Sequence, residues 1–203
     1  MKILFEDENL IVCVKPRGLL SQSDDKGREN MISLLSDTLK SEIFPLHRLD
    51  KEVGGVMVYA KTRQSAANLS KQIAEHNFKK QYIAMIHGKP TEREGNFFDL
   101  LFKDSKKNKS FVVKKERKGV KPASLDYETL SSDDNTSKVL ITLHTGRTHQ
   151  IRVQFASRKM PLIGDKKYGA SDDEKIIGLW SYKITFTHPV TKEALSFTCD
   201  PDF

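Results

Sequence analysis

The stretch from His47 to Thr62, HRLDKEVGGVMVYAKT, decides the fold and carries the first candidate for chemistry. Gly55 to Ala60 alternates in hydropathy like a half-buried β-strand, which places Asp50 on the loop that enters the strand. Gly54 and Gly55 would let the backbone approach a ligand closely. Taken alone, an aspartate two residues after an arginine is more often a turn residue or half of a local ion pair than a nucleophile.

Hydrophobic periodicity predicts further elements on both sides of this stretch. The predicted strands and hairpins cover residues 3–5 with 10–14, 82–86, 124–130, 139–143, and 181–187 with 194–198. Helices are predicted over 30–39 and 65–78, and a third begins at Thr148 as its cap. Strands outnumber helices and hairpins recur, so the predicted class is α+β, with a mostly antiparallel mixed sheet in two packed halves and flanking helices.

The composition indicates one soluble domain over residues 1–203, since 37% of the residues are hydrophobic and 30% charged. Cys13 and Cys199 belong to no CxxC pair or Cys/His cluster, which predicts two buried, reduced thiols and no metal site. Acidic residues at 6–8 interrupt any signal-peptide core, and no apolar run reaches membrane-spanning length. We therefore expect a cytoplasmic protein without a membrane partner.

The positive charge is concentrated in one short segment. Residues 103–121 hold nine basic and two acidic residues, which accounts for the whole net charge of +7. A polyanion is the natural partner of such a segment. The alternative is a solvated, lysine-rich loop that binds nothing. The lysines of this segment that would contact a polyanion are Lys106, Lys107, Lys114 and Lys115.

A second polar segment, TGRTHQIR from Thr145 to Arg152, places two arginines and a histidine at a predicted helix start. Helix amino termini favour anions, and arginine forks match phosphates and carboxylates. Arg147, His149 and Arg152 therefore suit an RNA backbone or a catalytic carboxylate. The alternative is a capped surface helix with ordinary charged residues.

Tyr82 lies in KKQYIAMIHG, and periodicity alone favours a core aromatic on its strand. Several signatures are missing from the sequence: the zinc-deaminase pattern, HExxH, GxxxxGK[ST] and GxGxxG. We therefore expect no cofactor, neither a metal nor a nucleotide.

Taken in order, the motifs resemble the RluA class of pseudouridine synthases over nearly the whole chain. The blocks that carry the resemblance are KPRG at 15–18, HRLDKEVGGVMVYAKT at 47–62, KKQYIAMIHG at 79–88, TGRTHQIRVQFASRKMPLIGDKKYG at 145–169 and FTHPVTKE at 186–193. The chain departs from the family at Val53-Gly54, usually Thr-Ser, at Gln154, often histidine, and at 157–160, usually a glycine-containing turn. The N-terminal S4 domain of many relatives has no room before the first block.

The resemblance implies the pseudouridine synthase fold with a central RNA-binding cleft, and a monomer that isomerises uridine in ribosomal or transfer RNA. In this family Asp50 would be the essential carboxylate, acting on the ribose or on the uracil ring. Arg152 would keep that carboxylate charged, and Tyr82 would pack on the uracil and handle its C5 proton. Arg48 would fill the space left by the flipped-out nucleotide. The remaining expected RNA contacts are His47, Arg147, His149 and the four lysines named above.

Two other hypotheses remain at this stage. The basic segment also fits a noncatalytic RNA-binding or folding factor on the same scaffold. A carboxylate-dependent glycosidase of free sugars needs a second catalytic carboxylate. No such carboxylate stands out beside Asp50 in the sequence.

Overall fold

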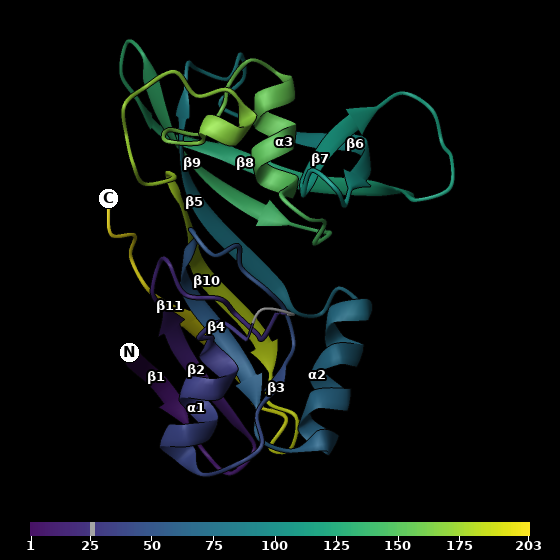
Figure 1. Cartoon of the computed structure of the whole chain (residues 1–203), viewed down its shortest axis with the longest axis vertical. Coiled ribbons are helices and arrows are strands. Elements are labelled where there is room, and N and C mark those ends of the chain that lie inside the picture. Colours follow the sequence, from purple (N-terminus) through teal and green to yellow (C-terminus); the bar gives the residue numbers. More distant parts are fainter. Residues whose placement is uncertain (25–26) are drawn as a thin grey trace. The chain divides into compact units, whose positions relative to one another are not determined.

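The structure is a computed structural model that describes residues 1–24 and 27–203 (Figure 1). Within those residues the chain forms eleven β-strands, three α-helices and one 3-10 helix, η1 (Lys166–Tyr168). It divides into two compact units. Unit 1 comprises Met1–Lys80 and Trp180–Asp202, and unit 2 comprises Gln81–Leu179 with Phe203.

Unit 1 is built on a mixed sheet with the strand order β1-β2-β4-β10. Strand β3 also pairs with β4, and β11 pairs with β10. The pairing is antiparallel except between β4 and β10, which run parallel. The bounds are β1 (Lys2–Glu6), β2 (Leu10–Lys15), β3 (Phe44–Pro45), β4 (Gly54–Ala60), β10 (Leu179–Thr187) and β11 (Ala194–Thr198). The hairpins predicted near both ends of the chain are thus confirmed, and so is the α+β class.

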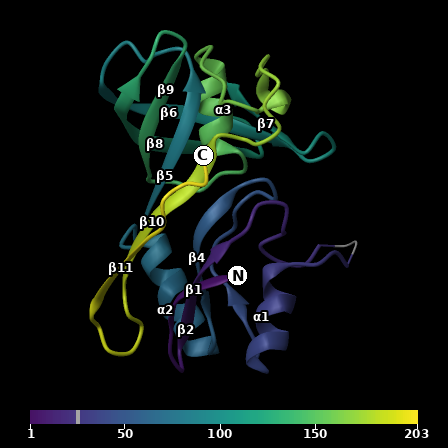
Figure 2. The same cartoon turned by 90° about the vertical axis from the view of Figure 1, so that its left-hand side faces the viewer.

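Helices α1 (Met31–Leu39) and α2 (Arg63–Ala74) lie on opposite sides of the unit 1 sheet (Figure 2). Each begins at a side-chain cap, Asn30 for α1 and Thr62 for α2. The helix predicted over 65–78 ends earlier, at Ala74. Phe78 instead leaves the helix and stacks on Phe186 in the core, with ring centroids 5.2 Å apart.

Strand β4 is buried at every residue, so the prediction of a half-buried strand was wrong. Val56 and Val58 pack in the core cluster that contains Leu69 of α2. On the other face, Tyr59 is fully buried and its hydroxyl donates to the carbonyl of Ser21. A central strand covered by helices on both sides has no polar face, which removes the alternation.

The glycines that open β4 serve the sheet, which corrects the interpretation that they admit a ligand. A Cβ at Gly54 would lie 2.3 Å from the Trp180 ring, and one at Gly55 would lie 2.2 Å from the Ser181 carbonyl oxygen. Gly55 also adopts a φ of 118°, which side-chain-bearing residues rarely reach. Both glycines therefore allow β10 to pair closely with β4.

Within unit 2 the sheet has the strand order β5-β9-β8-β6-β7. Its strands are β5 (Lys79–His87), β6 (Glu94–Asp104), β7 (Lys109–Val113), β8 (Val120–Ser132) and β9 (Thr136–Leu143). Helix α3 (Gln150–Ser157) covers one face of this sheet (Figure 1), where Val153 packs with Leu101 and Ala123. The strands predicted at 82–86, 124–130 and 139–143 are present and longer than expected, while β6 and β7 were not predicted.

Two local predictions were wrong. His149, at a φ of 53°, is the N-cap residue of α3 and makes no side-chain capping bond, so Thr148 does not cap the helix. Cys199 is only half-buried, whereas Cys13 is fully buried, and both are free thiols. The helices of the described ranges include none long and apolar enough to cross a bilayer.

Candidate active site

Asp50 lies on the loop that enters β4, partly buried, as the sequence predicts. Its backbone carbonyl accepts a hydrogen bond from Val53 N at 3.0 Å, which closes a tight turn directly before the strand. Polar contacts hold the residues on both sides of it. The carboxylate therefore sits on a loop whose backbone is fixed by its neighbours.

Ser21 holds the residue before Asp50. Its hydroxyl donates to the carbonyl of Leu49 at 2.9 Å and accepts from the amide of Leu49 at 3.0 Å. Ser21 is itself buried, and its own carbonyl accepts from the hydroxyl of Tyr59 at 3.1 Å. Hydrogen bonds of Ser21 thus connect the Asp50 loop to Tyr59 of β4.

Lys15 and its turn hold the residue after Asp50. The ammonium of Lys15 is fully buried and donates to the carbonyls of Leu19, Pro16 and Lys51 at 2.7, 2.9 and 3.2 Å. The amide of Gly18 donates to the same Lys51 carbonyl at 2.9 Å. Burial lowers the pKa of Lys15 to about 8, although the negative charges of Glu52 and Asp50 oppose the shift. The KPRG block is therefore the second clamp on the loop.

His47 and Arg48 precede the clamped residues and differ in environment. His47 accepts a hydrogen bond from Val58 N at 3.4 Å and packs on Phe78. Burial, with a smaller effect of Lys80, lowers the pKa of His47 to about 3, so its ring is uncharged at neutral pH. Arg48 is exposed, and within the described part of the chain it forms no ion pair. Of the two, only Arg48 offers a phosphate a positive charge.

Arg152 is buried in unit 2 and forms a bidentate ion pair with Asp165. Its Nε and Nη2 lie 2.7 and 2.8 Å from the two carboxylate oxygens, and Asp165 is also buried. The guanidinium lies over the ring of Tyr168, 5.2 Å from its centroid. Such bidentate ion pairs fix the plane of the guanidinium as well as its position. The predicted role of Arg152 towards Asp50 stays a prediction.

Gln150 organises the segment that precedes α3. Its side-chain oxygen accepts from the Thr145 hydroxyl at 2.8 Å and from Arg147 N at 3.0 Å, and its amide group donates to the carbonyl of Ser124 at 3.0 Å. Arg147 in turn donates from Nε to the carbonyl of Pro122 at 2.9 Å. The predicted anion-binding segment is therefore a preformed loop.

His149 and Tyr82 complete the predicted residues of unit 2. The Nδ1 of His149 lies 2.9 Å from the hydroxyl of Tyr168, with the two rings edge to face. Tyr82 is buried on β5, 6% exposed, which agrees with a core aromatic and leaves its catalytic role a prediction. Unit 1 thus holds Asp50, His47 and Arg48, and unit 2 holds the other predicted residues.

The basic segment comprises the last residues of β6, all of β7, the first residues of β8 and the turns between them. It is therefore more ordered than the loop that the sequence indicates. Lys106, Lys107, Lys114 and Lys115 are all exposed. In the ranges that the structure describes, no carboxylate lies within ion-pair distance of these four lysines. Their charge is therefore available to a partner.

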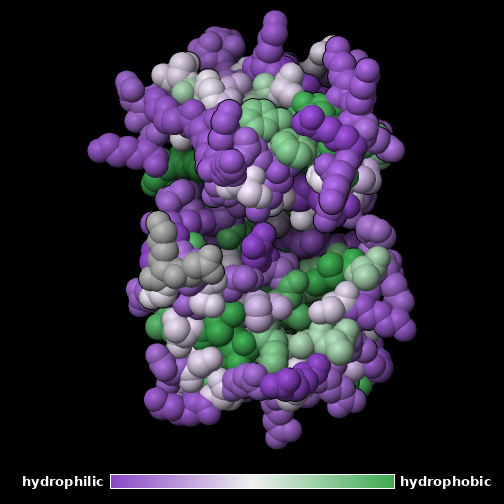
Figure 3. Space-filling view, turned by 45° about the vertical axis from the view of Figure 1, so that its right-hand side comes forward, coloured by the Kyte–Doolittle hydropathy of each residue, from purple (hydrophilic) through white to green (hydrophobic). Residues whose placement is uncertain are grey.

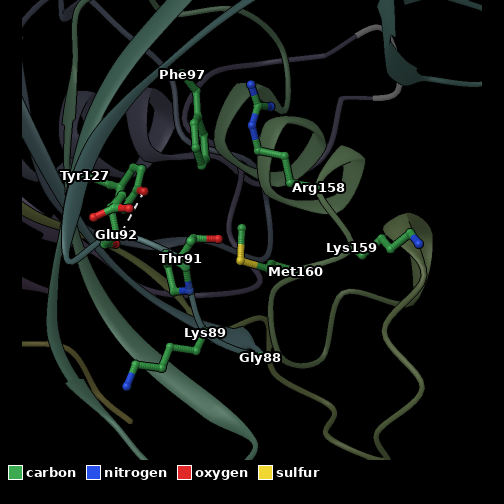
Figure 4. A pocket seen from close by; sticks show the side chains of 10 residues that line it. Gly88, Lys89, Thr91, Glu92, Phe97, Tyr127, Arg158, Lys159 and Met160 are labelled. Atoms are coloured by element: carbon green, nitrogen blue, oxygen red, sulfur yellow. Dashed lines mark hydrogen bonds between the residues drawn. The ribbon is translucent and has the colours of Figure 1, made fainter.

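A cavity of about 460 Å³ opens in unit 2, and the predicted site residues do not line it (Figure 4). Phe97 and Arg158 point into it from opposite elements, and the guanidinium lies 3.9 Å from the centroid of the Phe97 ring. Arg158 also pairs with Asp99 at 2.9 Å, so its charge is already balanced. The cavity is separate from the residues expected to do chemistry.

Sequence reasoning missed three residues that position the candidate site: Ser21, Gln150 and Asp165. The last two lie inside the block from Thr145 to Gly169, in which the arginines carry the stronger chemical signal. Ser21 lies in a polar loop and gives no signal by itself. In the described part of the chain, histidine, cysteine and acidic residues form no group of three that could hold a metal ion.

The chain is similar to known proteins over nearly its full length. Residues 9–157 match the family model described as RNA pseudouridylate synthase. The dual-specificity RNA pseudouridine synthase RluA of Escherichia coli K12 is 32% identical over 99% of this chain and 93% of its own. The ribosomal large subunit pseudouridine synthase C of Buchnera aphidicola is 32% identical over 93% of this chain and 63% of its own.

The fold is similar as well. The solved structure of the human RNA pseudouridylate synthase domain containing 4 covers 99% of this chain and 89% of its own, with a TM-score of 0.81 and 24% identity. That likeness concerns the fold, and the sequence relatives carry the family assignment. This chain belongs to the RNA pseudouridylate synthases and, among them, to the RluA class, enzymes that isomerise uridine in RNA to pseudouridine.

Proposed function

We propose that Asp50 is the essential carboxylate of this enzyme and that its substrates are specific uridines of ribosomal or transfer RNA. The reaction breaks the bond between N1 of uracil and the ribose, turns the base, bonds C5 to the ribose and releases the C5 proton. It needs neither a redox step nor an energy source. A carboxylate held in one place, in its ionised form, is the group that this reaction requires.

The proposal rests on the hydrogen bonds that fix the backbone on both sides of Asp50. Ser21 fixes Leu49, and Lys15 with Gly18 fixes Lys51, so the residue between them has little backbone freedom. Preorganised geometry is worth several kcal/mol in catalysis, because orientation is settled before the substrate binds. A loop that served only to connect two elements would not need this many buried contacts. The position of Asp50 is thus suited to chemistry.

The other predicted roles follow from residue type and environment. Arg152, held by Asp165, would favour the charged form of the Asp50 carboxylate. Tyr82 would pack on the uracil and handle the C5 proton. Arg48, exposed and without an ion pair in the described ranges, would fill the gap that a flipped nucleotide leaves. His47 is uncharged at neutral pH, so its contact with RNA would be one of shape or neutral hydrogen bonding.

The substrate class follows from the relatives and the charge. One relative is named for dual specificity and another for the ribosomal large subunit. The exposed lysines of unit 2 supply sequence-tolerant attraction to phosphates. Structured RNA is therefore the proposed partner.

The proposed activity is tested by tritium release. Wild-type protein is incubated with ribosomal and transfer RNA transcripts that carry tritium at C5 of uridine, and the label released to water is counted. Release from at least one class is expected, with pseudouridine found at defined positions by sequencing. A noncatalytic RNA-binding factor would bind the transcripts and release no label, and that result would overturn the proposal.

Replacing Ser21 with alanine is expected to lower kcat roughly ten- to a hundredfold with a smaller change in KM, since misplacing a catalytic group by about 1 Å costs up to about a hundredfold. The cause is the loss of both hydrogen bonds to Leu49. Steady-state kinetics of tritium release check it. Ser23→Ala removes an exposed serine two residues away and serves as the control. Equal kcat values for the two variants would show that Ser21 does not position the loop.

Changing Lys106, Lys107, Lys114 and Lys115 to glutamine is expected to weaken RNA binding and to reduce the salt dependence of the affinity. Each phosphate contact contributes about 0.7–0.9 to the slope of log K against log salt, so the slope should fall by about 3. Filter binding between 50 and 300 mM salt measures it. The control replaces four exposed lysines of unit 1, Lys2, Lys40, Lys71 and Lys192. An unchanged slope in the first variant would show that the basic segment does not touch phosphates.

A further inference from the structure

One face of the unit 2 sheet carries a row of aromatic side chains. In the register of β6 with β7, Phe102 lies opposite Phe111 and Leu100 opposite Val113. Residues opposite each other in an antiparallel pair share a face, and so do alternate residues along a strand. Phe98, two residues before Leu100, therefore belongs to the same face. We call this surface the aromatic face; its members are Phe98, Leu100, Phe102, Phe111, Val113, Val120, Pro122 and Ser124.

The aromatic face is exposed, in contrast to the opposite side of the same strands. Phe98 is 67% exposed and Phe111 is 37% exposed. Every other member of the face is half-buried or exposed. On the opposite side, Phe97 and Leu101 are buried against α3. The core of unit 2 therefore does not account for these phenylalanines, and an exposed row of apolar rings marks a binding surface.

One cation lies directly on this face and a second lies at its edge. The guanidinium of Arg117 lies over the ring of Phe102, 4.6 Å from its centroid. The ammonium of Lys109 lies 5.8 Å from the centroid of Phe111 and 4.9 Å from that of Tyr168, and it donates to the carbonyl of Lys167. Further basic residues follow on the turn between β7 and β8, beside the face. They are exposed and, among the described residues, have no carboxylate within ion-pair distance: Lys114, Lys115 and Lys118. Figure 3 shows green, apolar side chains that reach the surface with purple, hydrophilic ones around them.

We propose that the aromatic face is a stacking platform for unpaired bases of the RNA substrate, flanked by the lysines that hold the adjoining phosphates. Phe98 and Phe111 would each stack on a base, and the planar guanidinium of Arg117 would offer a third stacking surface. The inference rests on the proposed function, because it names the part of the RNA that this enzyme grips outside its catalytic residues. The partner is thus a single-stranded part of the RNA substrate.

Charge and residue type favour RNA over a protein partner. Aromatic rings on a sheet surface, with basic residues between them, are the means by which several RNA-binding folds hold single strands. The exposed basic residues beside the face match a phosphate backbone, whereas a protein partner would need a matching acidic surface. Stacking tolerates any base, which suits a surface without directed hydrogen-bond donors. Base stacking on an aromatic side chain is worth about 1–3 kcal/mol.

The test compares ring-removing with ring-preserving substitutions. Phe98→Leu with Phe111→Leu keeps an apolar side chain and removes both rings, and Phe98→Tyr with Phe111→Tyr keeps both rings. Leu130→Ala, on an exposed leucine of β8 beyond the segment that pairs with β6, is the control. Affinity is measured by fluorescence anisotropy for a labelled unstructured RNA decamer and for a ten-base-pair RNA duplex, at several salt concentrations. Thermal melting establishes that each variant is folded.

The leucine variant is expected to bind the decamer at least tenfold more weakly at every salt concentration, with the salt slope unchanged, since no phosphate contact is lost. Binding of the duplex should change less than threefold. The tyrosine and Leu130→Ala variants should bind like wild type. In tritium release the leucine variant should show a raised KM for the RNA substrate, while kcat stays within threefold of wild type, because the substitutions weaken binding and leave Asp50 unchanged.

Three results would overturn the platform. The first is that the leucine variant binds the decamer with wild-type affinity, and the second is that its affinity falls equally for the decamer and the duplex. The third is a change in self-association, measured by analytical ultracentrifugation, while the RNA affinity stays unchanged. The last would assign the face to a second copy of the chain. If wild-type protein releases no tritium while the leucine variant still loses decamer binding, the proposed function fails and the platform stands.

Discussion

Replacing Asp50 with asparagine is expected to abolish tritium release from uridine-labelled RNA, with a loss of at least about 10⁴-fold in kcat, as removal of an essential nucleophile or base does in other enzymes. The substitution keeps the size of the side chain and the backbone hydrogen bond from Val53 N. It removes only the charge and the nucleophilic oxygen. RNA affinity should remain within threefold of wild type. Single-turnover tritium release and filter binding measure the two quantities on the same preparations.

Glu52→Gln is the matched control for Asp50→Asn. Glu52 is an exposed carboxylate on the same loop, and the contact that holds it, from Arg17 to its backbone carbonyl, survives the change. The rate of tritium release by the Glu52→Gln variant should stay within threefold of wild type. Substantial activity of Asp50→Asn, or an equal loss in both variants, would refute the assignment of Asp50 as the catalytic carboxylate.

Asp165→Asn is expected to lower the free energy of unfolding by about 3–5 kcal/mol, the usual cost of removing one partner of a buried ion pair. The buried guanidinium of Arg152 loses a bidentate carboxylate, and an amide cannot accept both of its hydrogen bonds. In a protein of this size each kcal/mol corresponds to about 2–4 °C, so the melting temperature should fall by about 6–20 °C. Calorimetry or urea denaturation measures the loss.

The control is Asp173→Asn, which removes an exposed aspartate that lies 3.9 Å from Lys166. Exposed pairs of this kind are worth about 0–1 kcal/mol. If the two variants melt within 2 °C of each other, the ion pair of Arg152 with Asp165 does not stabilise unit 2. Tritium release by Asp165→Asn, measured well below its melting temperature, then shows whether the orientation of Arg152 matters for the reaction.

Local patterns in the sequence predicted most elements of the fold, because hairpins and amphipathic helices are short-range features. They misjudged features that depend on partners distant in the chain. Strand β4 is predicted to be half-buried, yet residues 56–60 are apolar without a break and helices on both sides bury the strand fully. Strands β6 and β7 were missed because Asp99 breaks the apolar run of β6 and because β7 holds only three apolar residues, Phe111 to Val113.

The residues proposed to act in the reaction stand out in the sequence, whereas the residues that hold them in place do not. Arginine, tyrosine and aspartate stand out by residue type within recognisable motifs. Ser21 acts through a contact 28 residues away, and Asp165 through one 13 residues from its partner. Such pairings depend on the folded backbone. The role of the two glycines that open β4 was misjudged for the same reason, since Trp180 and Ser181, against which they pack, lie more than a hundred residues further along the chain.

The pairing of β4 with β10 has a consequence for the order in which the protein is made. Gly54 and Gly55 pair with Trp180 and Ser181, so the strand behind the Asp50 loop lacks one of its neighbours until β10 has been synthesised, more than a hundred residues later. Unit 2, apart from its terminal Phe203, is continuous between residues 81 and 179 and reaches its full sequence earlier. Domains fold as their residues emerge, in the order of synthesis. The nascent chain therefore carries its basic surface before the Asp50 loop has its full support.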